Sequence, residues 1–367
     1  MLKRTRDIAD DEEPVSGETT KRKADCESHS AGLTHNDYTV GWVCALSKEQ
    51  TAATAMLDQR HADLSKQSND PNTYTLGSVG KHNVVIACLP KGQVATNLAA
   101  TVATWMISTF PSIKFGLMVG IGGGIPPKVR LGDIVVSTPV SQFPGVVQWD
   151  FGKAKQGGKF ERIGSLNNPP NVLLTALTKL ETEYELNGSR ISEYLDKLKQ
   201  KWPRLAPKYL RSESLEDVLF KADYGHVNKS TMDCAAITYN DEEEEGENCQ
   251  LCDRTQVVKR KPRDVRVHYG LIASGNQVIK DASFRDKVNR DLGGNILCFE
   301  MEAAGLMNNF PCIVIRGICD YADSHKNKNW QEHAAAVAAA FAKELLEYVQ
   351  PRDIDGERTA KDILSQS

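Results

Sequence analysis

Short runs rich in valine and isoleucine alternate along the chain with longer stretches whose apolar residues recur at helical spacing. The apolar runs predict strands, because a strand buried on both faces needs no polar alternation. They lie at residues 39–45, 83–89, 115–120, 132–137, 267–274, 296–299 and 312–318. Helices are predicted at 48–57, 95–109, 303–309 and 331–348. Strands that alternate with helices indicate an α/β fold, layered around a central parallel or mixed sheet.

Polar segments divide the chain into a folded domain, one long insertion and two tails. Residues 1–36 carry almost no large apolar side chains, so they predict a disordered tail. The domain is expected at 37–349, with an insertion at about 187–265 that is longer than a compact loop. Within it, residues 191–211 predict a basic helical stretch. Residues 350–367 are expected to form a polar C-terminal tail.

Composition then narrows the class of protein. The 367 residues are 40% hydrophobic and 25% charged, with a net charge of -3, which is typical of a globular chain. No apolar run reaches the roughly 18 residues of a membrane helix, and the N-terminus lacks the apolar part of a signal peptide. Positive charge is not concentrated in the expected domain, which argues against nucleic-acid binding. We therefore expect an intracellular protein, and the basic clusters 3–6 and 21–23, which resemble a bipartite nuclear import signal, allow the nucleus as well as the cytoplasm.

Acidic residues follow three of the predicted strands. Glu49 comes after the first strand, Glu300 and Glu302 end the sequence Cys-Phe-Glu-Met-Glu, and Asp320 follows the strand at 312–318. Burying a carboxylate among apolar residues is costly unless a positive charge or hydrogen bonds stabilise it, so acids in such positions often mark a functional site. In α/β sheets, ligands bind outside the carboxyl ends of the strands. These acids therefore predict a ligand pocket.

Two local features leave a purely structural interpretation open. Ser47 is predicted as the N-cap of the first helix, with Gln50 completing a capping box, and Glu49 then lies in the first turn, where an acid complements the helix dipole. The glycine-rich segment 119–127 predicts a turn whose backbone can approach a ligand closely. It has neither the ending of a P-loop nor a convincing dinucleotide fingerprint, and a tight structural turn explains it equally well.

Five segments match a known family in their order along the chain. They are 41–49 (Gly-Trp-Val-Cys-Ala-Leu-Ser-Lys-Glu), the glycine segment with Leu-Gly-Asp at 131–133, 270–275 (Gly-Leu-Ile-Ala-Ser-Gly), 300–304 (Glu-Met-Glu-Ala-Ala) and 318–323 (Ile-Cys-Asp-Tyr-Ala-Asp). Over most of 38–349 the chain resembles the nucleoside phosphorylase and nucleosidase superfamily, above all its methylthioadenosine/S-adenosylhomocysteine nucleosidase branch. Segments 145–152 and 323–328 are similar to a fungal set of these domains, some of which stand at the front of immune-type receptors.

The resemblance implies a three-layer α/β/α fold with a central mixed sheet, and a site for cleaving the N-glycosidic bond of a purine nucleoside or nucleotide. Glu302 would hold the ribose hydroxyls, Asp320 would protonate the purine at N7, and Glu49 would activate the attacking water. The other substrate-binding residues that it implies are Met301, Val278, Ile279, Gly122, Gly123, Ile121 and Cys319. It implies no cofactor and no metal, and a homo-oligomeric assembly.

The nucleophile follows from departures within this resemblance. Phosphorylases of the superfamily place an arginine and a serine on phosphate where this chain has Met118 and Ile121, neither of which pairs with an anion. Together with Glu49, this favours water over phosphate. A phosphate-dependent phosphorylase, and a sensing or defence signalling module with weak catalysis, stay open as alternatives.

Other departures concern the substrate. Val278 replaces the aromatic residue that stacks on the base in the nucleosidases, Asn276 replaces an acid and Cys319 a serine. The basic run at 325–328 and Lys91 are candidates for binding a 5′-phosphate, and solvated surface charge is the alternative.

The insertion carries a further pair of potential ligands. Cys249 and Cys252 are half of a zinc-site pattern, for which His226 and Cys234 are candidate partners. A reduced hairpin or a redox pair explains the two cysteines as well.

Overall fold

The computed structural model describes residues 32–227 and 249–366. Its strands are β1 (Val40–Cys44), β2 (Gln59–Arg60), β3 (Tyr74–Val79), β4 (His82–Cys88), β5 (Phe115–Gly124), β6 (Ile134–Ser137), β7 (Val146–Gln148), β8 (Gly152–Lys155), β9 (Lys159–Arg162), β10 (Val267–Ser274), β11 (Ile296–Glu300) and β12 (Cys312–Asp320). Its α-helices are α1 (Ser47–Met56), α2 (Thr96–Thr109), α3 (Asn171–Asn187), α4 (Ile191–Lys201), α5 (Ala206–Tyr209), α6 (Ala282–Asp291), α7 (Gln331–Tyr348), α8 (Pro351–Asp355) and α9 (Ala360–Leu364). Short 3-10 helices lie at His35–Asp37, Arg254–Gln256 and Ala303–Gly305.

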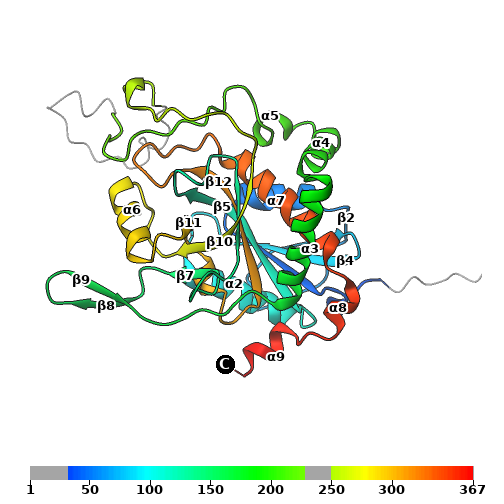
Figure 1. The fold of residues 1–367 in the computed structure, drawn as a ribbon. Coiled ribbons are helices and arrows are strands. Elements are labelled where there is room, and N and C mark those ends of the chain that lie inside the picture. Colours follow the sequence, from blue (N-terminus) through cyan, green and yellow to red (C-terminus); the bar gives the residue numbers. More distant parts are fainter. Residues whose placement is uncertain (1–31, 228–248, 367) are drawn as a thin grey trace, which may run out of the picture. The chain divides into compact units, whose positions relative to one another are not determined.

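One mixed sheet organises the domain, in the strand order β11-β10-β6-β12-β5-β1-β4-β3-β2 (Figure 1). The central strands β4, β1, β5 and β12 run parallel, so their carboxyl ends meet at one edge. β11 also pairs antiparallel with the last residues of β5, through Cys298 with Gly124 and Phe299 with Gly123. The strands β5, β12, β6, β10 and β11 therefore form a closed ring, and this ring adjoins the edge where the predicted acids lie.

Helices cover both faces of the sheet, as the apolar pattern of its strands requires. In β1, Trp42 and Cys44 face a core formed with α1, α3, α4 and α7, whereas Val43 faces a second core formed with α2. The same alternation recurs in β5, where Leu117 and Met118 enter opposite cores. This three-layer arrangement explains why these strands read as unbroken apolar runs.

Helix α7 lies unusually close to β12. A Cβ atom on Gly317 would lie 1.9 Å from the carbonyl oxygen of Ala334, so only glycine permits this approach. The alanine-rich face of α7 fills the narrow space above the strand. This contact fixes β12, whose end carries Asp320, against a buried helix.

The predicted helix at 303–309 is wrong. Only Ala303–Gly305 is helical, as one 3-10 turn, and irregular turns follow. A Cβ on Gly305 would lie 1.8 Å from the carbonyl oxygen of Thr96, and Phe310 must turn inward to fill the space above Gly116. Pro311 then prevents continuation of a helix.

The insertion and the C-terminal segment both contribute packed structure. Helix α4 of the insertion packs on α7 beside α3, which precedes the insertion, and the stretch predicted as helical at 191–211 is divided into α4 and α5. Ala360 of α9 is buried and donates its N–H to the carbonyl of Ile113 at 2.7 Å. Residues 1–31 and 228–248 lie outside the described part of the chain. Within the described part, no helix has the length and apolar character needed to cross a membrane.

Candidate active site

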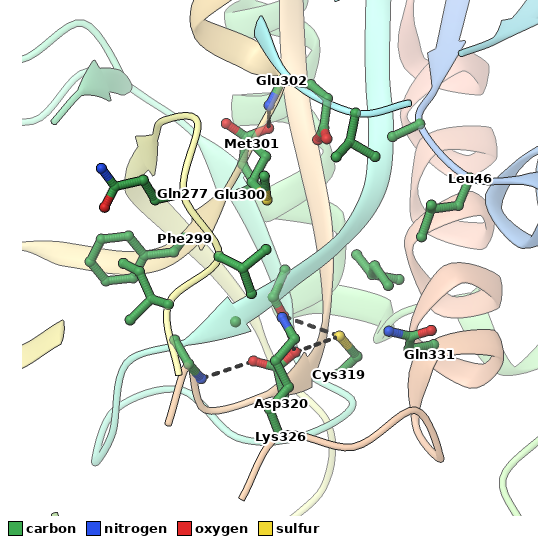
Figure 2. Close-up of a pocket in the computed structure, with 18 of the residues that line it drawn as sticks. Leu46, Gln277, Phe299, Glu300, Met301, Glu302, Cys319, Asp320, Lys326 and Gln331 are labelled. Atoms are coloured by element: carbon green, nitrogen blue, oxygen red, sulfur yellow. Dashed lines mark hydrogen bonds and ion pairs between the residues drawn. The ribbon is translucent and has the colours of Figure 1, made fainter. Parts of the chain in front are cut away.

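The predicted site residues converge on one pocket at the carboxyl edge of the sheet. Glu49 follows β1, Glu302 follows β11, and Asp320 ends β12. All ten residues of the sequence-based site line this pocket: Glu49, Asp320, Glu302, Met301, Val278, Ile279, Gly122, Gly123, Ile121 and Cys319. In Figure 2, Asp320 and Cys319 lie at one end of the pocket, and Met301 and Glu302 at the other. The roles of these residues stay predictions, but their proximity is a feature of the fold.

Glu49 is held rigidly by backbone amides. Its Oε2 accepts hydrogen bonds from the N–H groups of Ala45 at 2.7 Å and Leu46 at 2.9 Å, and its Oε1 accepts one from Ile121 at 2.8 Å. The predicted capping box is wrong: Leu46 is the N-cap, Ser47 is already helical, and the carboxylate of Glu49 satisfies amides at the helix start. Burial raises the pKa of Glu49, although Arg316 and these hydrogen bonds oppose the rise.

The glycine-rich segment forms the end of strand β5, so the predicted turn is wrong for 119–124. Pairing with β11 and β12 keeps the backbone extended through Gly124. A Cβ on Gly120 would lie 2.4 Å from Oε1 of Glu49, and a Cβ on Gly123 would lie 2.7 Å from Oδ1 of Asp320. Glycine is therefore needed here because two carboxylates lie directly against the strand.

Arg316 is a central residue of the site that the sequence analysis missed. Its side chain is 1% exposed, and it donates to Glu300 and, at 3.3 Å, to Oε2 of Glu302. Its NH1 also donates to the carbonyl of Ile121 at 3.4 Å. A single arginine inside the apolar run 312–318 was the available signal, because a buried guanidinium requires carboxylate partners.

Glu300 and Glu302 play different parts around this arginine. Glu300 accepts the N–H groups of Glu302 at 3.1 Å and Ala303 at 3.0 Å, so it fixes the turn after β11. Burial raises the pKa of Glu302, while the nearby Arg316 opposes the rise. Glu302 has fewer fixed partners and lines the pocket, where it can accept hydrogen bonds from a ligand.

Asp320 is oriented by its own loop. Oδ1 accepts the N–H of Ala322 at 2.8 Å, while Oδ2 lies 3.2 Å from the thiol of Cys319 and 3.2 Å from the ammonium of Lys326. Ala322 has φ of +49°, a left-handed conformation that is uncommon for alanine and that turns the chain back toward the carboxylate. Figure 2 shows Lys326 and Cys319 close to Asp320.

The pocket mouth and its wall differ in character. Val278, at the position where the resemblance leads us to expect a stacking aromatic, is 52% exposed and lies with Val94 at the mouth. Phe299 is 6% exposed and is an aromatic residue of the inner wall that the sequence analysis did not select. Asn276 has a structural role, because its Oδ1 accepts the N–H and hydroxyl of Thr96 at the start of α2.

Of the candidates for binding a 5′-phosphate, Lys326 lines the pocket, whereas His325 and Lys91 do not. The imidazole of His325 is buried and stacks on Phe220, with 4.0 Å between ring centroids. Burial, with a contribution from His226, lowers the pKa of His325 to about 4, so the ring is neutral near pH 7. Lys326 lies against Asp320, and Lys91 is exposed and outside the lining of the pocket.

Taken together, the pocket has the groups that cleavage of an N-glycosidic bond needs. That reaction builds positive charge on the sugar and negative charge on the departing base. A fixed carboxylate with a raised pKa suits a general base, and Asp320, a second acid in the same pocket, can serve the leaving group. Potential metal ligands lie outside this pocket: His226, Cys249 and Cys252 form a cluster in the insertion, while Cys234 lies outside the described residues.

Comparison with known proteins agrees with this chemistry. No family model matches the chain. A nucleotide-binding leucine-rich repeat-like protein of Hyaloscypha variabilis is 46% identical over 330 residues, which cover 89% of this chain. This chain spans only 31% of the length of that relative.

Two further relatives are named for their activity. A 5′-methylthioadenosine/S-adenosylhomocysteine nucleosidase of Mycobacterium bovis is 24% identical and matches over 84% of this chain and 95% of its own length. The ATP nucleosidase Cap17 of Escherichia coli is 24% identical over 68% of this chain and 39% of its own length.

The fold is also found among solved structures. The 5′-methylthioadenosine/S-adenosylhomocysteine nucleosidase of Helicobacter pylori superposes with a TM-score of 0.52 and 15% sequence identity, covering 85% of this chain and 99% of its own. With the order of the motifs and the three-layer mixed sheet, these relatives identify the chain as a member of the nucleoside phosphorylase and nucleosidase superfamily.

Proposed function

We propose that this domain hydrolyses the N-glycosidic bond of a purine nucleoside or nucleotide and releases free base and sugar. The observation that carries the proposal is the convergence of Glu49, Glu302 and Asp320, from three separate strand ends, on one pocket. Relatives named as nucleosidases support the same reaction class.

In the proposed mechanism, Glu49 positions water and accepts its proton as the water oxygen attacks the anomeric carbon. The bond between this carbon and the purine nitrogen breaks, and its electron pair moves to the base. Asp320 donates a proton to N7 of the departing purine, and Glu302 accepts hydrogen bonds from the ribose hydroxyls. The three amides bonded to Glu49 support its role, because they fix the direction of its free lone pairs.

The charge around Arg316 supports water as the nucleophile. This arginine is bound to Glu300 and Glu302, and its positive charge is therefore already neutralised. Met118 is buried in the core, and Ile121 offers no side-chain donor at the pocket. A phosphate dianion entering beside Glu49 and Glu302 would meet like charge and no available guanidinium.

The substrate class is a purine compound, with Phe299 as the wall against which the base lies. The relatives include nucleosidases named for thio-nucleosides and for ATP, so both a nucleoside and a nucleotide belong in the test. A role in a defence-type receptor is a further proposal. It is suggested by the similarity to the nucleotide-binding leucine-rich repeat-like protein of Hyaloscypha variabilis, 31% of whose length this chain matches.

Assembly and compartment are part of the proposal. We infer a homo-oligomer, supported by the exposed Phe151 and Phe160 at the β8-β9 hairpin, since large apolar side chains at a protruding edge are typical of contact surfaces. We infer an intracellular compartment, cytoplasmic or nuclear, supported by the free thiols of the seven cysteines in the described residues.

The test is chromatographic measurement of released base. Adenosine, methylthioadenosine, inosine, guanosine, AMP and ATP are incubated with the protein, each with and without phosphate. We expect release from at least one of them without phosphate, and its loss in Asp320→Asn but not in the control Asp291→Asn, which changes an exposed aspartate of α6. Strict dependence on phosphate would instead identify a phosphorylase, and no release from any of them would favour a sensing module.

A further inference from the structure

Three potential metal ligands meet in the insertion, outside the catalytic pocket. The Nδ1 atom of His226 lies 3.3 Å from Sγ of Cys252 and 3.7 Å from Sγ of Cys249. The three ligand atoms all lie within 4.8 Å of one another, and Cys252 is buried. Neither cysteine is part of a disulfide.

The spacing of these atoms fits a tetrahedral zinc ion. With zinc–sulfur bonds near 2.3 Å and zinc–nitrogen bonds near 2.0 to 2.1 Å, a tetrahedral angle separates sulfur and nitrogen by about 3.5 Å. The two sulfur–nitrogen distances in the structure, 3.3 and 3.7 Å, lie on either side of that value. Both sulfur atoms lie near the same ring nitrogen, Nδ1 of His226. A thiol–imidazole hydrogen bond needs only one sulfur there, whereas coordination of one ion brings both sulfurs to that nitrogen.

The surrounding chain holds the two parts of the cluster together. The N–H of Val227 points at Sγ of Cys252, at 3.5 Å, as second-sphere donors to metal-bound thiolates do. The N–H of Asp253 donates to the hydroxyl of Tyr224 at 2.7 Å, and Phe220 pairs with Val257 across the same two segments. Hydrogen bonds and a β-bridge between the two segments therefore hold His226 close to the two cysteines of the Cys-x-x-Cys pair.

We propose that His226, Cys249 and Cys252 bind one zinc ion, with the fourth position of the tetrahedron taken by water or a further side chain. The ion is structural, because none of its ligands lines the catalytic pocket. The soft sulfur ligands favour zinc over magnesium or calcium.

The site is connected to the loop that follows β12. The N–H of His226 donates to the hydroxyl of Ser324 at 3.0 Å, and His325 stacks on Phe220 of the insertion. The same loop continues to Lys326, which reaches Asp320. Zinc bound to the insertion would therefore hold the loop in the position that the catalytic pocket requires.

The experiment measures metal bound to the full chain, independently of activity. Protein expressed with zinc in the medium is desalted, and its zinc content is measured by elemental mass spectrometry. The apoprotein is then titrated with Co²⁺ and followed by absorption spectroscopy. We expect about one zinc per chain and a thiolate-to-cobalt charge-transfer band. Cys249→Ser, Cys252→Ser and His226→Ala should each lose most of the metal, and the control Cys88→Ser should keep it.

Two outcomes would overturn the proposal. One is a wild-type chain that binds neither zinc nor cobalt at its cysteines while thiol counting or peptide mapping finds Cys249 bonded to Cys252. The other is metal content that is unchanged in all three ligand variants. Because the cobalt spectrum is recorded on the wild-type chain, misfolding of a variant does not affect the first of these readouts.

Discussion

The ammonium of Lys326 lies 3.2 Å from Oδ2 of Asp320, so the basic run that follows β12 reaches the proposed acid of the catalytic site. Asp320 itself is held by the N–H of Ala322 on its other oxygen. Lys326 also lines the pocket, so it could act with Asp320 on the base or bind a 5′-phosphate of the substrate.

Replacing Lys326 distinguishes the two roles. We expect Lys326→Met to lower kcat/KM for adenosine and for AMP by a similar factor, about 10-fold or more, because proton transfer by Asp320 is common to both substrates. The measurement is steady-state kinetics on both, with Lys199→Met, an exposed lysine of α4, as control. A loss confined to AMP would instead assign Lys326 to the phosphate.

In the proposed mechanism, Glu49 accepts the proton of the attacking water. Glu49→Gln keeps the side-chain shape but removes the base, and we expect kcat of the folded variant to fall by about 10²- to 10⁴-fold. Its NH2 group must face a backbone N–H that the carboxylate accepted, so the melting temperature should fall as well. Glu185→Gln, at an exposed position of α3, is the matched control. Equal activity in the two variants would exclude Glu49 as the base.

The pH profile of the wild-type enzyme tests the same residue. Burial raises the pKa of Glu49, and only the ionised carboxylate can accept the proton of water. Activity should therefore be present above this raised pKa and be lost as pH falls through it, at a higher pH than for an ordinary glutamate. The acid limb of kcat/KM against pH is the measurement, and a limb at or below the usual glutamate range near 4.3 would contradict the assignment.

Arg316 and Glu300 form a buried ion pair beneath the pocket. Arg316→Met should reduce the free energy of unfolding by about 3–5 kcal/mol, because it leaves Glu300 buried without a counter-charge. The double variant Arg316→Met with Glu300→Gln should regain part of this stability. Urea unfolding of both variants is the measurement, with the exposed Arg290→Met as control. A double variant less stable than the sum of its single changes would contradict the pairing.

Gly123 lies directly against the proposed acid. In Gly123→Ala, the new Cβ would lie 2.7 Å from Oδ1 of Asp320 and 2.9 Å from Cβ of Ala322, so the carboxylate must move. We expect kcat to fall by about 10²-fold, since a misplaced catalytic group costs that much. The control Gly356→Ala has open space around its Cβ and should keep full activity. Wild-type kcat in Gly123→Ala would show that Asp320 tolerates displacement.

Much of the fold could be predicted from local sequence. The strands β1, β4, β10 and β12 were predicted to within about two residues, because strands buried on both faces appear as unbroken apolar runs. The segments at 119–124 and 303–309 were predicted wrongly, because tertiary contacts override local preference there: pairing with β11 keeps the glycines extended, and close packing on Thr96 interrupts the helix.

Apolar periodicity and an acid beside a buried strand are local signals, so the α/β architecture and the three acids at strand ends could be predicted from the chain alone. The partners of those acids follow from how the strands and helices pack. Arg316 of β12 meets Glu300 of β11, although these two strands do not pair in the ring, and His226 meets Cys249 and Cys252 through the folded insertion. Such pairs depend on how separate elements pack against one another, so the sequence could offer Arg316 and His226 as candidates but could not decide which groups meet.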